Sequence, residues 1–187
     1  MKTLLTLLLL IPSLSWSGNK EIFEKGLSEF KNRNYLEAEK IFKELIIPQV
    51  SDCDSYCKEA YFYLGGMYLE KLPNFPTDYV KAYEYLKMAS VARNKMSNIY
   101  ISMLLTTGAL EEHLETGGSY GNPSHKTKVL GLAYLILGVK SGLSEYEANI
   151  NIIQKNLNLD SDDLKDAQKL ANNFYNCIYL DKGDCSK

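Results

Sequence analysis

Apolar residues recur every three or four positions along most of the chain after residue 20, and no segment alternates apolar and polar residues over the length of a strand. A period between three and four is typical of amphipathic helices, whereas alternation would indicate a half-buried strand. The pattern therefore predicts an all-α protein. The expected helices are Glu21–Lys31, Tyr35–Ile47, Lys58–Lys71, Asp78–Arg93, Lys95–Thr107, Lys126–Ser141, Leu143–Leu157 and Ser161–Leu180.

Several of these helices carry terminal signals. Asn34 and Asp78 precede the second helix of the first two pairs and are expected N-caps, because their short side chains can accept hydrogen bonds from free backbone N–H groups. Ser161 is followed by Asp162 and Asp163, which predicts a helix start with a serine cap and two acids at the positive end of the dipole.

Small residues recur at a regular interval, which indicates an internal repeat. Gly26, Gly65 and Ser102 are separated by 39 and 37 residues, and each is expected where two helices pass closely. In the partner helices a small residue stands four positions before a large apolar one, so that both face the same way. These pairs are Ala38 with Phe42, Ala82 with Leu86 and Gly131 with Leu135. The spacing predicts that small and large residues interlock between antiparallel helices.

The second helix pair resembles a Sel1-like repeat, a relative of the tetratricopeptide repeat with a longer loop. The matching stretches are Ala60-x-x-x-Leu64-Gly65-x-Met67-Tyr68 and Asp78-Tyr79-x-x-Ala82-x-x-Tyr85-x-x-x-Ala89. The first pair is closer to a tetratricopeptide unit, and the third is a degenerate copy. The resemblance covers nearly all of the chain after the N-terminal segment and implies a right-handed α-solenoid of antiparallel hairpins.

In the tetratricopeptide arrangement, the first helix of each pair lines a concave face. The resemblance therefore implies a set of partner-binding candidates at fixed positions around the small residue of each repeat. They are Phe23, Glu24, Leu27 and Lys31 in the first repeat, Phe62, Tyr63, Gly66 and Glu70 in the second, and Ile99, Tyr100, Met103 and Thr107 in the third. Core packing is the competing interpretation for the aromatic members, because the tyrosines of Tyr61-Phe62-Tyr63 cannot all be exposed.

The N-terminal segment predicts export. Lys2 is followed by a short apolar run and then by small residues around Ser17, as in a signal peptide spanning residues 1–17, and the run is too short to cross a bilayer. The domain from residue 18 to 187 is expected outside the cytoplasm, and the sequence leaves the periplasm and full secretion as alternatives. Without Lys2, 20 basic residues stand against 23 acidic ones, a net charge of −3 that argues against nucleic acid as a partner.

All four cysteines lie in the exported domain. In an oxidising compartment an even number of cysteines favours disulfides, and proximity favours Cys53 with Cys57 and Cys177 with Cys185 among three pairings. The spacing matches neither a redox pair nor a zinc site.

Residue types that carry catalysis or bind cofactors form no recognisable constellation. Ser28 with Lys31 and Ser55 with Lys58 match Ser-x-x-Lys, but the other elements of penicillin-recognising enzymes are absent. His113 and His125 belong to a Gly-rich loop that suits a solvated segment better than a metal site. We therefore expect a protein that is not an enzyme and that uses no cofactor or metal.

The function expected from the resemblance is stoichiometric binding of a protein partner. One such role is immunity, in which the protein sequesters a toxic effector such as a phospholipase, with the loop from Ala109 to His125 as an inserted inhibitory element. The alternative is a periplasmic scaffold or regulator of envelope assembly or signalling. A homodimer through the tyrosine-rich surface, and an enzyme acting on the cell wall, are further alternatives.

Overall fold

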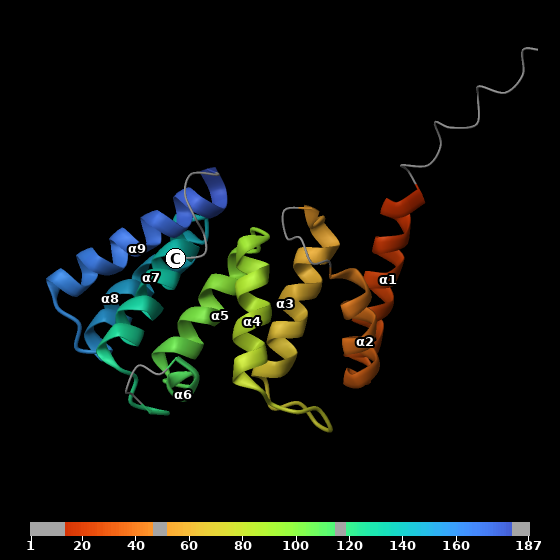
Figure 1. The fold of residues 1–187 in the computed structure, drawn as a ribbon, viewed down its shortest axis with the longest axis horizontal. Helices are drawn as coiled ribbons and strands as arrows, with labels where there is room; N and C mark the ends of the chain where they lie inside the picture. The colour runs from red at the N-terminus through yellow and green to blue at the C-terminus, as the bar shows by residue number, and fades with distance from the viewer. Residues whose placement is uncertain (1–13, 47–51, 115–118, 181–187) are drawn as a thin grey trace, which may run out of the picture.

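The computed structural model describes residues 14–46, 52–114 and 119–180, and within these ranges the protein is all-helical, without a β-strand. Figure 1 shows the helices following one another in chain order along the longest dimension of the molecule. They are α1 (Leu14–Lys31), α2 (Tyr35–Leu45), α3 (Ser55–Leu69), α4 (Tyr79–Val91), α5 (Lys95–Thr106), α6 (Glu111–Leu114), α7 (His125–Lys140), the 3₁₀ turn η2 (Ser144–Tyr146), α8 (Glu147–Asn156) and α9 (Ser161–Leu180).

Most helices pack on their neighbours along the chain. Contacts join α1 with α2, α2 with α3, α3 with α4, α4 with α5, α5 with α7, and α7 with both α8 and α9. The first helices of successive pairs also touch, α1 against α3 and α3 against α5. This layout places α1, α3 and α5 next to one another although their sequences are separated by α2 and α4.

The predicted interlocking of small and large residues is confirmed in the first two helix pairs. A Cβ built on Gly26 would lie 2.7 Å from Cε1 of Phe42, and one built on Gly65 would lie 2.6 Å from Cγ of Leu86. Because real Cβ atoms do not approach this closely, only glycine fits at both positions.

In the third pair two small residues meet instead. A Cβ on Gly131 would lie 3.4 Å from the carbonyl oxygen of Ser102 and 2.8 Å from Cγ2 of Thr106. A Cβ on a second glycine of α7, Gly138, would likewise lie only 2.8 Å from Cδ1 of Ile99. Ser102 therefore lies at a close helix crossing, as expected, and the residue opposite it is the small Gly131 and not a large apolar residue as in the first two pairs.

Five of the described turns between helices use the same backbone geometry at the helix C-terminus. Arg33, Arg93, Gly108, Gly142 and Asn158 adopt positive φ angles of 63°, 69°, 71°, 114° and 53°. In each turn the next residue donates a hydrogen bond to a carbonyl five residues earlier, for example Asn34 N to Glu29 O at 2.9 Å and Asn94 N to Ala89 O at 2.8 Å. This is the Schellman motif, which reverses the chain and satisfies carbonyls that the helix leaves free.

Two of the three predicted caps need correction. Asp78 caps α4 as expected, because its Oδ1 accepts a hydrogen bond from Lys81 N at 3.0 Å. Asn34 stands at the N-cap of α2 but makes no capping bond, since its Nδ2 donates to Glu29 at 2.7 Å. The cap of α9 is Asp160 and not Ser161.

Two carboxylates cap the N-terminus of α9. Oδ1 of Asp160 accepts from the backbone N–H groups of Asp162 and Asp163 at 2.8 and 2.9 Å, and Oδ2 of Asp163 accepts from Asp160 N at 2.9 Å. These backbone hydrogen bonds lower the pKa of Asp160, since they stabilise its charged form. The reciprocal pairing is a capping box, with an aspartate in each role.

Helix boundaries otherwise follow the predicted pattern to within a few residues, with three differences. α1 begins at Leu14, so the end of the segment predicted as a signal peptide continues directly into the first helix. The segment expected as Leu143–Leu157 starts with the 3₁₀ turn η2 before α8. The loop after α5 contains the short helix α6.

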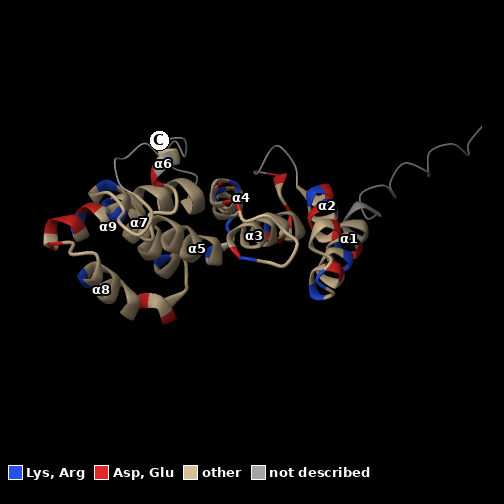
Figure 2. Ribbon diagram, turned by 90° about the horizontal axis from the view of Figure 1, so that it is seen from below, with Lys and Arg blue, Asp and Glu red and all other residues tan. Residues whose placement is uncertain are grey.

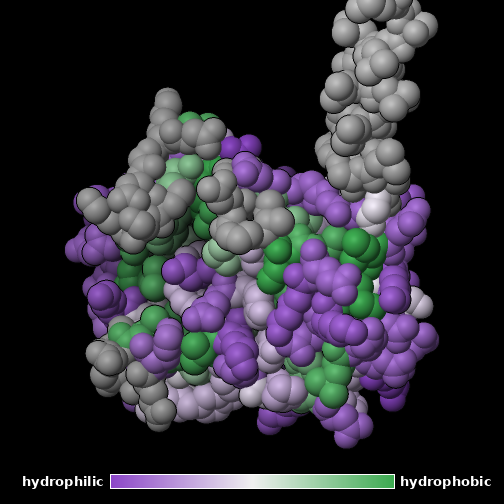
Figure 3. Space-filling model, turned by 45° about the vertical axis from the view of Figure 1, so that its right-hand side comes forward, coloured by the Kyte–Doolittle hydropathy of each residue, from purple (hydrophilic) through white to green (hydrophobic). Residues whose placement is uncertain are grey.

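Charged residues of both signs lie together on the helices at both ends of the molecule. Figure 2 shows blue and red residues together on α1 and α2 at one end and on α8 and α9 at the other. Apolar surface is divided into separate patches bordered by hydrophilic residues (Figure 3). No helix within the described ranges is both long and apolar enough to cross a membrane.

Candidate functional site

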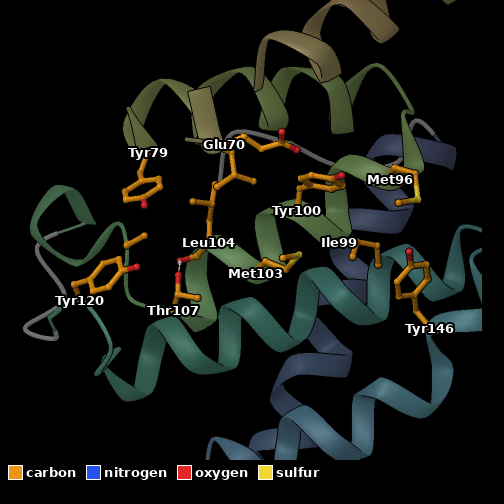
Figure 4. A pocket seen from close by; sticks show the side chains of 12 residues that line it. Glu70, Tyr79, Met96, Ile99, Tyr100, Met103, Leu104, Thr107, Tyr120 and Tyr146 are labelled. Carbon is orange, nitrogen blue, oxygen red and sulfur yellow. Dashed lines mark hydrogen bonds between the residues drawn. The ribbon is translucent and has the colours of Figure 1, made fainter. Parts of the chain in front are cut away.

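A mainly apolar groove runs along α5 and has a volume of about 450 Å³. Figure 4 shows its lining side chains, which come from the end of α3, the start of α4, α5, the loop around α6 and the turn η2. The residues that line it are Leu69, Glu70, Tyr79, Met96, Ile99, Tyr100, Met103, Leu104, Thr107, Ala109, Tyr120 and Tyr146. We refer to this feature as the α5 groove.

The floor of the α5 groove is one face of helix α5. Met96, Tyr100, Met103 and Thr107 are spaced by four, three and four residues, so they project from the same side of the helix or its C-cap, and Ile99 lies beside Tyr100 at the edge of that side. The opposite side of α5 is buried against α4 and α7. The solvent-accessible side of α5 is therefore the side that lines the groove.

One end of the α5 groove is formed by two stacked tyrosines. The rings of Tyr79 and Tyr120 have centroids 6.3 Å apart and an interplanar angle of 21°. Burial, reinforced by the neighbouring Tyr120 hydroxyl, raises the pKa of Tyr79. Tyr120 itself is 71 % exposed, so one face of the pair remains available to a ligand.

The position of Tyr120 is fixed by the backbone around it. Gly121 N donates to Thr107 O at 2.7 Å, and Ser119 and Asn122 form an isolated antiparallel bridge. Gly108, at φ 71°, lies so close to this bridge that a Cβ on it would be 2.3 Å from Ser119 O. The described ends of the loop are therefore tied to the C-terminus of α5.

The other side of the same loop is anchored by a buried carboxylate. Glu111 is 2 % exposed, and its Oε1 accepts from Ser124 N, the N-cap of α7, at 3.0 Å. Leu110 and Pro123 are buried as well. The expectation of a wholly solvated loop is wrong for these residues, which pack against the helices that the loop connects.

The charge of the α5 groove comes from one side chain. Glu70, the exposed C-cap residue of α3, is the only charged residue among those that line the groove in the described part of the chain. Burial raises the pKa of the Tyr100 hydroxyl, and the Glu70 carboxylate and Tyr146 raise it further. Figure 4 shows Glu70 and Tyr100 on neighbouring parts of the groove wall.

Three of the predicted partner-binding residues, Glu70, Tyr100 and Met103, lie in the α5 groove, together with the Ile99 and Thr107 positions implied by the same resemblance. Met103 is 54 % exposed although its helix is otherwise well buried. Met103 and Tyr120 are two of the large apolar side chains that are exposed in the described ranges, and both line this groove.

The predicted aromatic residues of the first two repeats lead up to the α5 groove as a continuous row. The ring centroid of Phe23 lies 5.8 Å from that of Tyr63, Tyr63 lies 6.1 Å from Phe62, and Phe62 lies 5.2 Å from Tyr100. Contacts of this kind stabilise neighbouring helices beyond the area that they bury. Phe23 is buried and packs against Phe42, so it belongs to the core.

The remaining predicted positions, three in α1 and one in α3, lie outside the groove. Glu24 and Lys31 are exposed, and Glu24 pairs with Lys20 at 3.6 Å along the helix. Leu27 is half-buried against the core. Gly66 is half-buried, with open space where a side chain would be.

Seven of the lining residues were not predicted from the sequence as binding candidates: Leu69, Tyr79, Met96, Leu104, Ala109, Tyr120 and Tyr146. Tyr79 matches only the repeat pattern of the second helix pair. Tyr120 stands in a Gly-, Ser- and Asn-rich stretch that carries no periodic signal. A single large aromatic residue within such a stretch was the one available indication that the segment packs on something.

The histidines take no part in the groove. His113 is exposed, and His125, the first residue of α7, pairs with Asp163 of α9 at 2.8 Å. Within the described ranges no three His, Cys, Asp or Glu side chains come together as a metal site would require.

The disulfide predicted between Cys53 and Cys57 is confirmed, with a Cα–Cα distance of 5.3 Å across the start of α3. Between them Asp54 caps α3, because its Oδ1 accepts from Tyr56 N and Cys57 N at 2.9 and 2.8 Å. Its other oxygen accepts from Asn19 of α1 at 3.0 Å. Cys177 is also disulfide-bonded, and its predicted partner Cys185 lies outside the described residues.

In comparisons with known proteins, no family model, no curated protein and no solved structure matches the chain.

Proposed function

We propose that the protein is an exported Sel1-like or tetratricopeptide-like solenoid that binds a protein partner without catalysing a reaction. The packing order supports this proposal, because α1, α3 and α5 touch in succession as the first helices of stacked hairpins do. The single observation that carries it is the α5 groove. An open, tyrosine- and methionine-lined concavity on the expected face has the composition of an interface centre.

Immunity is the particular role that we favour. A protein that sequesters a toxic enzyme, such as a phospholipase delivered by a rival cell, needs a rigid surface and no chemistry of its own. The loop from Ala109 to His125 contributes Tyr120 to the groove rim through an anchored backbone, which suits an element that enters a partner's active site. Export to the periplasm would put the protein where such an effector arrives.

The first experiment is capture of the tagged protein from the native periplasm, followed by mass spectrometry of what remains bound after stringent washing. We expect one dominant partner at near-equal stoichiometry, with a toxicity that co-expression of this protein neutralises. Several substoichiometric envelope proteins would instead favour the scaffold alternative. A protein recovered with nothing bound would contradict the proposal.

Two matched variants test whether the groove is the surface used. Met103→Lys changes a 54 % exposed side chain inside the α5 groove, and Ile152→Lys changes a 55 % exposed side chain on α8 outside it. Both should fold, because neither side chain is buried. We expect Met103→Lys to weaken partner affinity by about tenfold or more and Ile152→Lys to leave it unchanged. Equal affinities for the two variants would rule out the groove.

A further inference from the structure

The α5 groove combines several features that attract a positive charge. Four tyrosine rings line it, Tyr79, Tyr100, Tyr120 and Tyr146, and the face of an aromatic ring is electronegative. Met96 and Met103 add polarizable sulfur atoms between the rings. A lining of this kind favours a cation with an aliphatic stem over a purely apolar side chain.

The Glu70 carboxylate has no counter-ion within the described part of the chain. No ion pair or hydrogen bond of the Glu70 side chain occurs among the residues that the structure describes, and no lysine or arginine lines the groove. Glu70 and Tyr100 both line the groove, and Figure 4 shows them on neighbouring parts of its wall. A ligand cation placed beside both would find a negative charge and a ring face together.

Helix ends add to the negative potential. α3 ends at Leu69 and α5 ends at Thr106, both at the groove, and neither has a basic residue in its last turn. By contrast α1, α2, α7 and α8 carry Lys31, Lys43, Lys140 and Lys155 in their last turns. α4 and α9 also lack a basic residue in the last turn, but among the described helices α3 and α5 are the ones whose uncompensated C-termini lie at the groove.

Elsewhere in the same molecule, a carboxylate and a tyrosine ring lie together with lysine cations. At Tyr68 the hydroxyl donates to Glu39, the Nζ of Lys43 lies 2.5 Å from the same carboxylate, and the Nζ of Lys81 lies 5.1 Å from the ring centroid. Lysines also lie over Tyr83 and Tyr175. Among the described residues no lysine or arginine lies over a tyrosine of the groove, so there the carboxylate and the rings lack the cation.

We propose that the α5 groove receives a basic side chain of the partner protein, with its cation beside Glu70 and the Tyr100 ring and its aliphatic stem along Met103. Arginine fits better than lysine, because a planar guanidinium stacks on tyrosine while it binds a carboxylate. This inference rests on the proposed function, since it specifies the chemistry of the partner that enters the groove. The partner surface is accordingly a loop that presents arginine between apolar residues.

The test uses two fluorescein-labelled peptides, Gly-Leu-Arg-Leu-Gly and the same peptide with citrulline, which keeps the shape of arginine and removes its charge. Their binding to the full-length protein is followed by fluorescence anisotropy up to about 1 mM peptide. We expect the arginine peptide to bind about tenfold more tightly than the citrulline peptide. Glu70→Gln should abolish this preference, and Glu84→Gln, an exposed change on α4 outside the groove, should retain it.

Equal binding of the two peptides, or no binding of either, would overturn the assignment of a basic side chain. Whether the protein binds a protein partner at all is tested separately, with the partner captured from the periplasm. If that partner binds wild type and Glu70→Gln equally but loses affinity for Met103→Lys, the groove is the interface and only its basic occupant is wrong. Self-association by sedimentation that Met103→Lys removes would instead assign the groove to a second copy of this chain and overturn the proposal.

Discussion

The side chain of Leu86 in α4 fills the space next to the Cα atom of Gly65 in α3. A Cβ on Gly65 would lie 2.6 Å from Leu86 Cγ and 3.2 Å from its backbone nitrogen. The absence of a side chain at Gly65 therefore permits the close approach of the two helices. Gly26 and Phe42 repeat the relationship between α1 and α2, which sets the packing distance of the first two helix pairs by the same device.

Gly65→Ala should destabilise the protein by about 1–3 kcal/mol, since the added methyl group must displace Leu86 or separate the helices. Gly66→Ala is the matched control one residue further along α3, where nothing lies within 4 Å of the new Cβ. There the better helix propensity of alanine should raise stability by about 0.5–1 kcal/mol. Urea unfolding followed by circular dichroism measures both, and a similar change for the two variants would contradict the proposed role of Gly65.

Gly108→Ala should destabilise the protein more than Gly121→Ala. Both residues have positive φ angles, 71° and 78°, so each substitution carries a conformational cost of about 1–2 kcal/mol. Only at Gly108 would the new Cβ also meet backbone, at 2.3 Å from Ser119 O. Thermal unfolding compares the stabilities, and limited proteolysis should show faster cleavage of the loop in Gly108→Ala. Equal effects would mean that Ser119 moves away at no cost.

Glu59→Gln should increase stability at neutral pH. Burial raises the pKa of Glu59, while Lys58 and the hydrogen bond from Asn94 only partly oppose this effect. A raised pKa in the folded state means that ionisation costs stability as pH rises through it, so the wild type is penalised at pH 7. Glutamine keeps the acceptor for Asn94 without the charge.

The stabilisation by Glu59→Gln should fade as pH falls below about 4, where the wild-type carboxyl is protonated in both folded and unfolded states. Urea unfolding at neutral and acidic pH measures this difference. Glu84→Gln removes a charge from an exposed position and should show no comparable gain at pH 7. A gain in Glu59→Gln that stayed constant with pH would point to packing and not to ionisation.

Replacement of Cys53 and Cys57 by alanine should lower the free energy of unfolding by about 2 kcal/mol. The disulfide closes a loop of only four residues in sequence separation, so its effect on the unfolded chain lies at the low end for disulfides. The measurement is made without reductant, so that the disulfide of Cys177 is kept. Asp54→Ala, which removes the cap within the same loop, should cost about 1 kcal/mol by itself.

Local features of the fold were predictable because they depend on residues close together in sequence. The 3.6-residue period located the helices, and α9 has the predicted bounds of Ser161 and Leu180. The recurrence of Gly26 and Gly65 predicted the close crossings that are observed. The cap of α9 was misassigned because Asp160 and Ser161 are both good caps and the choice depends on where the chain enters the helix.

The candidate site could be predicted only in part. Glu70, Tyr100 and Met103 share the repeat positions of α3 and α5, so a pattern pointed to them. Tyr120 and Tyr146 reach the groove from segments that have no repeat counterpart. The pairing of His125 with Asp163 likewise joins residues 38 positions apart, and no local signal marks it.

The sequence by itself determined the helices, their order and the small residues that let them approach, because hydrophobic periodicity and side-chain size act over a few residues. Only the tertiary structure decided which tyrosines became core and which remained open. Tyr83 and Tyr134 are buried in the core, whereas Tyr100 is half-buried and Tyr120 is exposed, at an edge where α3 ends and the loop turns back. Exposure depends on what arrives from distant parts of the chain, and that is a property of the assembled fold.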